Sequence, residues 1–213
     1  MSGYCKIAPG HPLHGPYHDR EYGFASRDET VLFERLCLEI MQAGLSWELV
    51  LKRRPTLNAA FADFDVDTVA RFGARDVKRL MADPGIIRNR LKVDAVIDNA
   101  KRIQALRQSH GGFAQWLDAH EIFDGKPRDK AAWVKLFKQT FRFTGGEIVN
   151  EFLMSLGRLP GAHAPDCPVY KRLVKLQARS RANAKPKAAA GGASAPRRPA
   201  RRAAAARSTA RAR

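Results

Sequence analysis

Apolar residues recur every three or four positions over most of the chain, which is the spacing of helices with one buried face. Ser26 and Glu29 have the spacing of a capping box, and they predict the start of a helix that Gly44 closes. Ser46 is expected to cap a second, short helix that ends at Pro55, because proline lacks the N–H of a helix interior.

The centre of the chain predicts two helices joined by a tight connection. Residues 67–72 form a short helix that Gly73 closes, and a further helix stops at a Pro84-Gly85 turn. A long periodic segment follows, with apolar residues at the helical spacing from Val93 to Ile103. Residues 83–92 are therefore predicted to form a hairpin between two helices.

The last part of the pattern is also helical. Residues 131–139 predict one helix, and a second capping box at Thr144 and Glu147 predicts a final helix that ends at Gly157. Residues 111–112 and 121–128 are interpreted as loops. Because no segment alternates apolar and polar residues as a strand does, the expected fold class is all-α.

The net charge of +17 is concentrated at the C-terminal end. Residues 171–213 hold 14 Lys and Arg and no Asp or Glu, whereas residues 1–170 hold 24 basic and 21 acidic side chains. Aromatic residues are absent after Tyr170, and Ala, Arg, Pro and Lys dominate, so this segment cannot bury a core. We expect a helical domain over residues 1–170 and a disordered basic tail over residues 171–213 that attracts phosphate nonspecifically.

Membrane and export signals are not evident. No apolar run approaches the roughly 20 residues that cross a bilayer, and the first residues lack a basic leader followed by an apolar stretch. The expected location is the cytoplasm, with no membrane partner, and a monomer is the simplest expectation. In such a chain the three cysteines favour core thiols, nucleophiles or metal ligands over disulfides, and Cys37 is interpreted as a core thiol.

Two cysteines and two histidines lie near the two ends of the expected domain, at Cys5, His18, His163 and Cys167. Zinc accepts two thiolates and two imidazoles in a closed tetrahedral site, which would join two irregular ends of the domain. From spacing alone, coincidence explains the pattern equally well, and His11 and His14 are rival ligands.

A glutamate and several aromatic residues form a second set of candidates. Glu39 lies among Leu38, Ile40 and Met41, on or near the apolar side of its predicted helix. It is either a salt-bridged surface residue or a partly buried acceptor for a polar ligand. The neighbouring aromatic residues, Tyr17, Tyr22 and Trp47, are either ordinary core residues or a wall that stacks on a flat cation.

The predicted hairpin suggests a phosphate site. It places backbone amides at a helix start beside cationic side chains, and this combination binds phosphate. The residues concerned are Gly85, Ile86, Ile87, Arg88, Arg90 and Lys92. A generic helix connection with solvated charges would give the same short pattern.

Several motifs follow one another in a characteristic order. They are Cys5, Tyr17-His18-Asp19, Glu21-Tyr22-Gly23, Leu38-Glu39-Ile40-Met41-Gln42-Ala43-Gly44-Leu45-Ser46-Trp47, Gly85-Ile86-Ile87-Arg88-Asn89-Arg90, Phe143-Thr144-Gly145, His163 and Cys167. Together they resemble the DNA-3-methyladenine glycosylase I family, from about Cys5 to Tyr170. The resemblance implies the helix-hairpin-helix DNA glycosylase fold and a structural zinc ion bound by Cys5, His18, His163 and Cys167.

The resemblance also implies an activity, the hydrolysis of the N-glycosidic bond of 3-methyladenine in alkylated double-stranded DNA. The damaged base would be flipped from the duplex, leaving an abasic site. By resemblance Trp47 stacks on the base, Tyr17 and Tyr22 line the pocket, and Glu39 accepts hydrogen bonds from its adenine edge.

The same resemblance assigns the DNA contacts. Gly44 and Leu45 would lie near the gap that the flipped nucleotide leaves. The amides of Gly85 and Ile86, with Arg88 and Arg90, would hold the DNA backbone.

The sequence departs from the family near the pocket. Lys6-Ile7 occupies the place of a Trp, His14 that of a Tyr and Tyr22 that of a Trp, which removes aromatic surface. Asp94 and Asp98 follow the hairpin, but the family is known for lacking a catalytic Asp there, and neither is assigned that role.

Two other functions fit the residues. One is a non-catalytic DNA-binding protein that uses the same domain and basic tail, and the other is a structural zinc protein with an unrelated ligand. Release of 3-methyladenine that depends on Glu39 and Trp47 distinguishes the enzyme from both.

Overall fold

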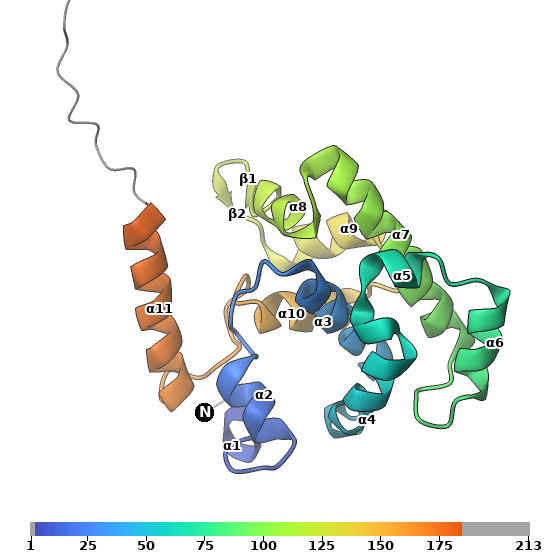
Figure 1. Cartoon of the computed structure of the whole chain (residues 1–213). Helices are drawn as coiled ribbons and strands as arrows, with labels where there is room; N and C mark the ends of the chain where they lie inside the picture. Colours follow the sequence, from blue (N-terminus) through green and yellow to red (C-terminus); the bar gives the residue numbers. More distant parts are fainter. Residues whose placement is uncertain (1–2, 185–213) are drawn as a thin grey trace, which may run out of the picture.

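The structure is a computed structural model that describes residues 3–184, with side chains to residue 176. Its elements are α1 (Gly3–Ile7), α2 (His14–Arg20), α3 (Glu29–Gln42), α4 (Trp47–Ala60), the short 3-10 helix η1 (Ala62–Phe64), α5 (Val66–Ala70), α6 (Ala74–Ala82), α7 (Arg90–His110), α8 (Phe113–Ala119), β1 (Ile122–Phe123), β2 (Lys126–Pro127), α9 (Lys130–Thr140), α10 (Gly146–Ser155) and α11 (Pro168–Ala184). The fold is mostly helical (Figure 1). None of the described helices is long and apolar enough to span a membrane.

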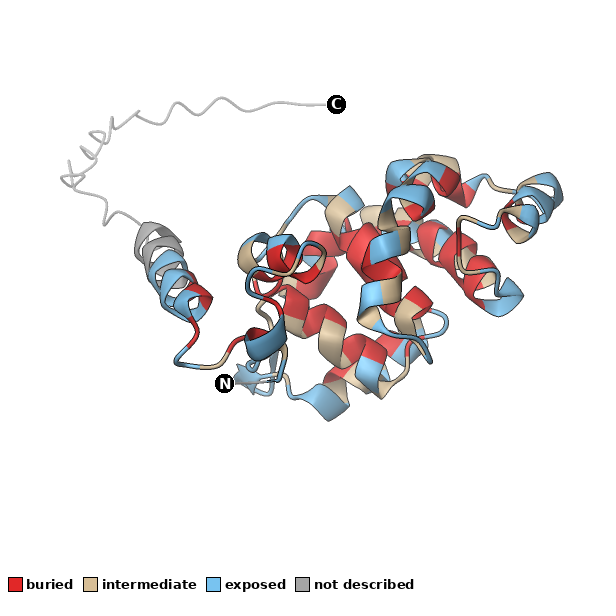
Figure 2. Ribbon diagram, turned by 90° about the horizontal axis from the view of Figure 1, so that it is seen from below, coloured by how far each residue is buried: buried red, intermediate tan, exposed pale blue. Residues whose placement is uncertain are grey.

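Helix α3 lies at the centre of the main core. Every residue from Leu32 to Met41 is buried, so this helix is covered on all sides rather than along one stripe. It packs against α4, α7, α8 and α10 (Figure 1), and Figure 2 shows the buried residues concentrated on the faces where these helices meet. Each fully buried side chain such as Phe33 or Leu36 stabilises the fold by roughly 1.5 to 3 kcal/mol.

Two predicted capping boxes are wrong. Helix α3 is capped by Asp28, whose carboxylate accepts the N–H of Val31, while the hydroxyl of Ser26 accepts the N–H of Asp28 instead. Helix α10 starts after Gly145, because the hydroxyl of Thr144 donates to the carbonyl of Phe141 and does not cap the helix. Ser26 bonds the backbone two residues ahead and Thr144 bonds a carbonyl three residues behind, so neither side chain accepts the N–H that a capping box requires.

Ser46 caps α4 as predicted, since its hydroxyl accepts the N–H of Leu49 at 3.2 Å. The predicted end at Pro55 is wrong, because α4 continues through this residue to Ala60. Proline removes one helix hydrogen bond, but Leu57 and Ala60 beyond it are buried in the core. Their burial favours continuation of the helix over the local preference of proline to end it.

The predicted pair of helices around a turn is confirmed by α6 and α7, with residues 83–89 between them. Asn89 caps α7 by accepting the N–H of Lys92 at 3.2 Å. The segment over residues 121–128 differs from the predicted loop, because β1 and β2 pair there as a small antiparallel hairpin. The described chain is therefore mostly helical rather than strictly all-α.

Helix α11 crosses the boundary that the sequence placed after residue 170. Figures 1 and 2 show α11 beside the helical body. Its first turns are held there because Val169 and Leu173 are buried against Cys5 and Cys167. Residues 171–184 are helical, unlike the predicted tail, and residues 185–213 of that tail lie outside the described residues.

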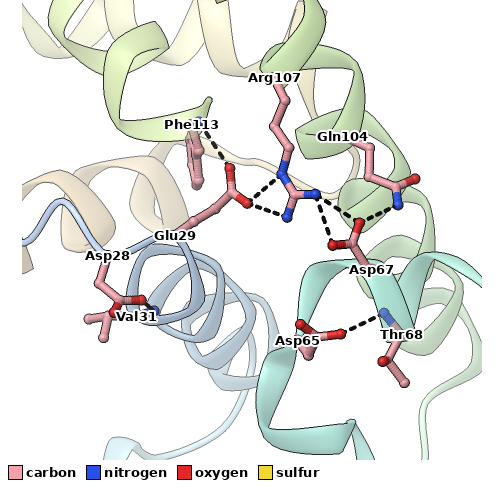
Figure 3. Close-up of polar contacts among 9 residues, drawn as sticks. All are labelled: Asp28, Glu29, Val31, Asp65, Asp67, Thr68, Gln104, Arg107 and Phe113. Atoms are coloured by element: carbon pink, nitrogen blue, oxygen red, sulfur yellow. Dashed lines mark hydrogen bonds and ion pairs between the residues drawn. The ribbon is translucent and has the colours of Figure 1, made fainter. Parts of the chain in front are cut away.

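Ion pairs join helices that are distant in sequence. Arg107 of α7 binds Glu29 at the start of α3 and Asp67 of α5, and Glu29 also accepts the N–H of Phe113 (Figure 3). A second group links α3, α4 and the segment after α2. In it the Arg54 guanidinium binds both Glu34 and Glu21 with N···O distances of 2.8 to 2.9 Å.

We expect the Arg54→Met substitution to lower the free energy of unfolding by about 2 kcal/mol, because it leaves two partly buried carboxylates side by side without their cation. Urea unfolding at pH 7 measures the change. Lys52→Met, an exposed cation on the same helix, is the control and should change stability by less than about 0.5 kcal/mol. Equal effects of the two substitutions would show that the buried ion pairs do not hold these segments together.

Candidate functional site

Four potential metal ligands from both ends of the domain lie together in one buried group, the candidate metal cluster. It consists of Cys5, His18, His163 and Cys167. Cys5 lies in α1, His18 in α2, and His163 and Cys167 precede α11. Cys5 Sγ lies 3.7 Å from His163 Nδ1, and Cys167 Sγ lies 3.7 Å from both His163 Nδ1 and His18 Nε2. In a tetrahedral zinc site, sulfur and nitrogen ligands are about 3.6 Å apart, so this cluster has the dimensions that zinc requires.

The second ring nitrogen of each histidine has an oxygen partner. His18 Nδ1 lies 2.7 Å from the Asp19 carboxylate, and His163 Nε2 lies 2.7 Å from the carbonyl oxygen of Tyr22. Such partners fix the tautomer in which the inward nitrogen has a free lone pair. This cluster could therefore hold a metal ion.

The backbone at Gly23 lies very close to the side chain of His163. Gly23, which follows Tyr22, has a φ of +82°, and a Cβ there would lie 3.0 Å from Leu173 and 3.1 Å from His163. A larger residue would be strained and would push these side chains away. The Glu21-Tyr22-Gly23 motif is thus needed for the packing of the metal cluster.

The rival histidines form a different group. His11, His14 and Glu48 lie close enough together to be considered as ligands. His11 Nδ1 accepts the backbone N–H groups of Leu13 and His14, both at 3.2 Å. Since the neutral ring then carries its proton on Nε2, it has no lone pair to offer a metal ion, and this group does not fit.

Glu39 is buried, with 4% of its surface exposed, so the surface interpretation is wrong. Burial and the nearby charge of Glu151 raise the pKa of Glu39 well above its usual range, and the guanidinium of Arg35 opposes them. Among the described residues, no hydrogen-bond donor holds its carboxylate. Arg35 was not among the residues predicted from the sequence, although it lies one helical turn before Glu39.

Several aromatic rings lie near this carboxylate. The ring centroids of Tyr17 and Trp47 are 5.1 Å apart, those of Tyr17 and Tyr22 are 5.8 Å apart, and those of Tyr4 and Tyr22 are 5.5 Å apart. Burial raises the pKa of each of the three tyrosines, and the charge of Glu39 adds to each rise. The structure therefore brings Glu39, Tyr17, Tyr22 and Trp47 together.

Two further residues complete this wall. The Tyr4 hydroxyl lies 3.4 Å from His14 Nδ1 and its ring contacts Tyr22, while the Tyr22 hydroxyl donates to Glu151 at 3.0 Å. Neither Tyr4 nor Glu151 was predicted. Tyr4 could have been found from its position next to Cys5, whereas Glu151 carries no local signal.

The metal cluster and the aromatic wall are adjacent. The rings of Tyr22 and His163 lie 5.6 Å apart, and those of Tyr4 and His18 lie 5.7 Å apart. A change in the position of either histidine would thus reach the residues around Glu39.

The predicted DNA-contacting residues lie at two exposed turns. Gly44, with a φ of +79°, and the 37% exposed Leu45 form the tip between α3 and α4. At the second turn, Arg88 precedes α7 and Arg90 is its first residue; both are exposed, and Arg90 pairs with Asp94.

Three details of this turn differ from the prediction. The helix starts at Arg90, so the amides of Gly85 to Ile87 precede it instead of opening it. The N–H of Gly85 is bound by the Asp83 carboxylate at 2.7 Å, and the side chain of Ile86 is buried. Lys92 is buried and does not face solvent with the arginines.

Comparison with known proteins places the chain in a family. Residues 7–170 match the family model described as methyladenine glycosylase. The chain is 36% identical to DNA-3-methyladenine glycosylase 1 of Escherichia coli (strain K12), over 78% of this chain and 96% of that protein. It is 32% identical to DNA-3-methyladenine glycosylase of Haemophilus influenzae, over 79% of this chain and 98% of that protein.

Solved structures agree. A variant of 3-methyladenine DNA glycosylase I in complex with 3-methyladenine matches with a TM-score of 0.70 and 32% identity, covering 78% of this chain and 97% of that chain. The enzyme from Staphylococcus aureus gives a TM-score of 0.69 with 32% identity, covering 78% and 96%. The fold is thus that of the helical 3-methyladenine DNA glycosylases. The chain belongs to the methyladenine glycosylase family.

The raised pKa of Glu39 predicts a pH-dependent stability. At pH values between the usual carboxyl pKa and the higher folded value, the folded protein holds a proton that the unfolded chain has lost, so stability falls as pH rises. We expect Glu39→Gln to melt at a higher temperature than the natural protein at pH 7 to 8, with a smaller difference at pH 4.5. Thermal unfolding across this range measures it.

The exposed Glu48→Gln, which removes a carboxylate from α4, is the control for Glu39→Gln. The melting temperature of this control, relative to that of the natural protein, should not increase as the pH rises. A Glu39→Gln variant whose melting temperature follows that of the natural protein at every pH would contradict the burial of this carboxylate.

Proposed function

We propose that this chain hydrolyses the N-glycosidic bond of 3-methyladenine in alkylated double-stranded DNA and leaves an abasic site. The observation that carries the proposal is the buried carboxylate of Glu39 among the rings of Tyr17, Tyr22 and Trp47, in a member of the methyladenine glycosylase family. The bound 3-methyladenine in the similar solved structure supports the choice of base.

The chemistry of the damaged base suits these residues. Methylation at N3 makes the base a cation, so the bond to C1′ breaks with both electrons leaving on a base that becomes neutral. Water adds its oxygen to C1′ and loses a proton to solvent. Because the leaving group needs no proton, the site needs a means of holding the cation rather than a strong general acid.

Glu39 supplies the negative charge for this task. Its carboxylate has acceptor capacity for the amino group of the adenine edge, and a cation in the pocket would offset the cost of burying the charge. Flipping the base from the duplex costs a few kcal/mol, which stacking on Trp47 helps to offset. Tyr17 and Tyr22 would line the sides of the pocket.

The two exposed turns would hold the DNA. Leu45, next to Gly44 at the tip, presents an apolar side chain that would fill the gap left by the base. Around Gly85 and Ile86 the backbone would approach a phosphate, with Arg88 and Arg90 supplying positive charge. Nonspecific attraction of phosphate remains our proposal for the basic residues 171–213.

We further propose that Cys5, His18, His163 and Cys167 hold a structural zinc ion. Four protein ligands would leave no open position, so the ion would stabilise the fold without taking part in the reaction. The ligands tie α1 and α2 to the segment before α11, where the cluster of buried apolar residues is small.

The first test is excision. We expect Glu39→Ala to lower the rate of 3-methyladenine release from methylated duplex DNA by about 100-fold, because charge stabilisation inside a buried site is lost. The exposed Glu48→Ala, beside Trp47 in sequence, is the control and should keep the rate of the natural protein. Chromatography of the released base measures both. A natural protein that binds methylated DNA and releases no base would instead be a non-catalytic binder.

The second test is metal content. We expect about one zinc ion per chain in the purified protein, and its loss in Cys167→Ser should lower the melting temperature by about 10 °C, since several kcal/mol of binding free energy are lost. The Cys37→Ala variant alters a buried cysteine outside the cluster and should keep its zinc. Zinc retained at full occupancy in Cys167→Ser would contradict the ligand set.

A further inference from the structure

Lys92 is a buried cation bound by backbone oxygens. It lies in the first turn of α7 with 4% of its surface exposed. Its ammonium group donates to the carbonyl oxygens of Met41 at 2.8 Å and Ala43 at 2.6 Å. Among the described residues, no carboxylate pairs with it, and burial lowers its pKa.

The two acceptors lie at the C-terminal end of α3. The last four carbonyls of a helix lack partners within the helix, and together they carry a partial negative charge. Lys92 therefore supplies both the missing hydrogen bonds and an opposing charge. This contact explains how an ammonium group can be buried without an acidic partner.

In the sequence, Met41 and Ala43 lie between Glu39 and Trp47, the two residues that would hold the base. Met41 and Ala43 follow Glu39 by two and four residues, and they precede Trp47 by six and four residues. The chain between Glu39 and Trp47 leaves α3, passes the exposed tip and enters α4. Fixing its two carbonyls therefore fixes the carboxylate and the indole relative to each other.

On its other side Lys92 belongs to the hairpin. Its own N–H is bound by Asn89, which caps α7. Helix α4 contacts the same hairpin through two residues. The Arg53 guanidinium donates to the carbonyl oxygen of Pro84 at 3.0 Å, and the Thr56 hydroxyl donates to the carbonyl oxygen of Gly85. The hairpin is thus bonded to both helices that meet at the tip.

We propose that Lys92 is a positioning residue that couples the hairpin, where the DNA backbone would bind, to the spacing of Glu39 and Trp47. This inference rests on the proposed glycosylase function. Lys92 touches neither the base nor the phosphate in this arrangement. It transmits the position of the bound duplex to the residues that hold the flipped base.

The test compares Lys92→Met, which removes the charge and the donors, with Lys92→Gln, which removes the charge and keeps a donor. The control is Lys101→Met, an exposed lysine of the same helix. Single-turnover release of 3-methyladenine and the Kd for an undamaged duplex are measured at least 10 °C below each melting temperature. Quenching of tryptophan fluorescence by free 3-methyladenine measures the affinity of the pocket.

We expect the single-turnover rate of Lys92→Met to fall by about 10- to 100-fold, the cost of misplacing reacting groups by a fraction of an ångström to one ångström. Binding of the free base should weaken, and the Kd for undamaged DNA should stay within threefold. The single-turnover rate of Lys92→Gln should also fall, but by a smaller factor. The rate of Lys101→Met should equal that of the natural protein.

The outcomes separate the two proposals. If the natural protein releases no 3-methyladenine, the proposed function fails and this inference with it. If the natural protein is active and the folded Lys92 variants have lower melting temperatures but rates within threefold of it, Lys92 is structural only. Should Lys92→Met fail to fold, Lys92→Gln decides by the same threefold limit, and failure of both to fold would also assign Lys92 to stability alone.

Discussion

The carboxylate of Glu39, buried on a helix that the core covers on all sides, is the constraint on which the rest of the structure depends. An ionised carboxylate in such a place costs several kcal/mol unless a partner offsets it. The guanidinium of Arg35 offsets this cost only in part. The nearby carboxylate of Glu151 has the same negative charge and adds to the cost. The charge of this carboxylate is therefore only partly compensated, and a cation beside it would complete the compensation.

The four Cys and His residues lie at a part of the fold where the cluster of buried apolar residues is small. Helices α1 and α2 are too short to bury a large apolar face, yet they carry Tyr4 and Tyr17 of the aromatic wall. The bond from His163 to the carbonyl of Tyr22 and the ring contacts of Tyr4 and Tyr22 with the cluster join the two sites. These contacts thus link the packing of the N-terminal segment to the positions of Tyr4 and Tyr22.

Periodicity predicted the central helices well, because α3, α6 and α7 bury strong apolar patterns that dominate local effects. It failed where tertiary packing overrides local chemistry. Pro55 continues a helix because the residues beyond it are buried, and Ser26 and Thr144 bond backbone groups other than the N–H that a capping box would use.

The candidate site was predictable only in part. Glu39, Trp47 and the four Cys and His residues carry recognisable local signals, whereas Arg35, Glu151 and Lys92 act through contacts between elements far apart in sequence. For Lys92 the prediction of a solvated side chain was wrong, although a lysine beside two arginines is ordinarily exposed. Its burial follows from the position of the end of α3, which no local pattern reveals.

The start of α11 has a consequence for how the chain would find its substrate. Because this helix begins one residue after Cys167, its first basic residues, Lys171 and Arg172, lie close to the Cys and His cluster, and the Arg172 guanidinium packs over the Phe24 ring. Under the proposed function, this charge would raise the effective concentration of phosphate-binding groups close to the aromatic wall. The same charge on the opposite side of the molecule would lie away from Glu39 and the aromatic rings.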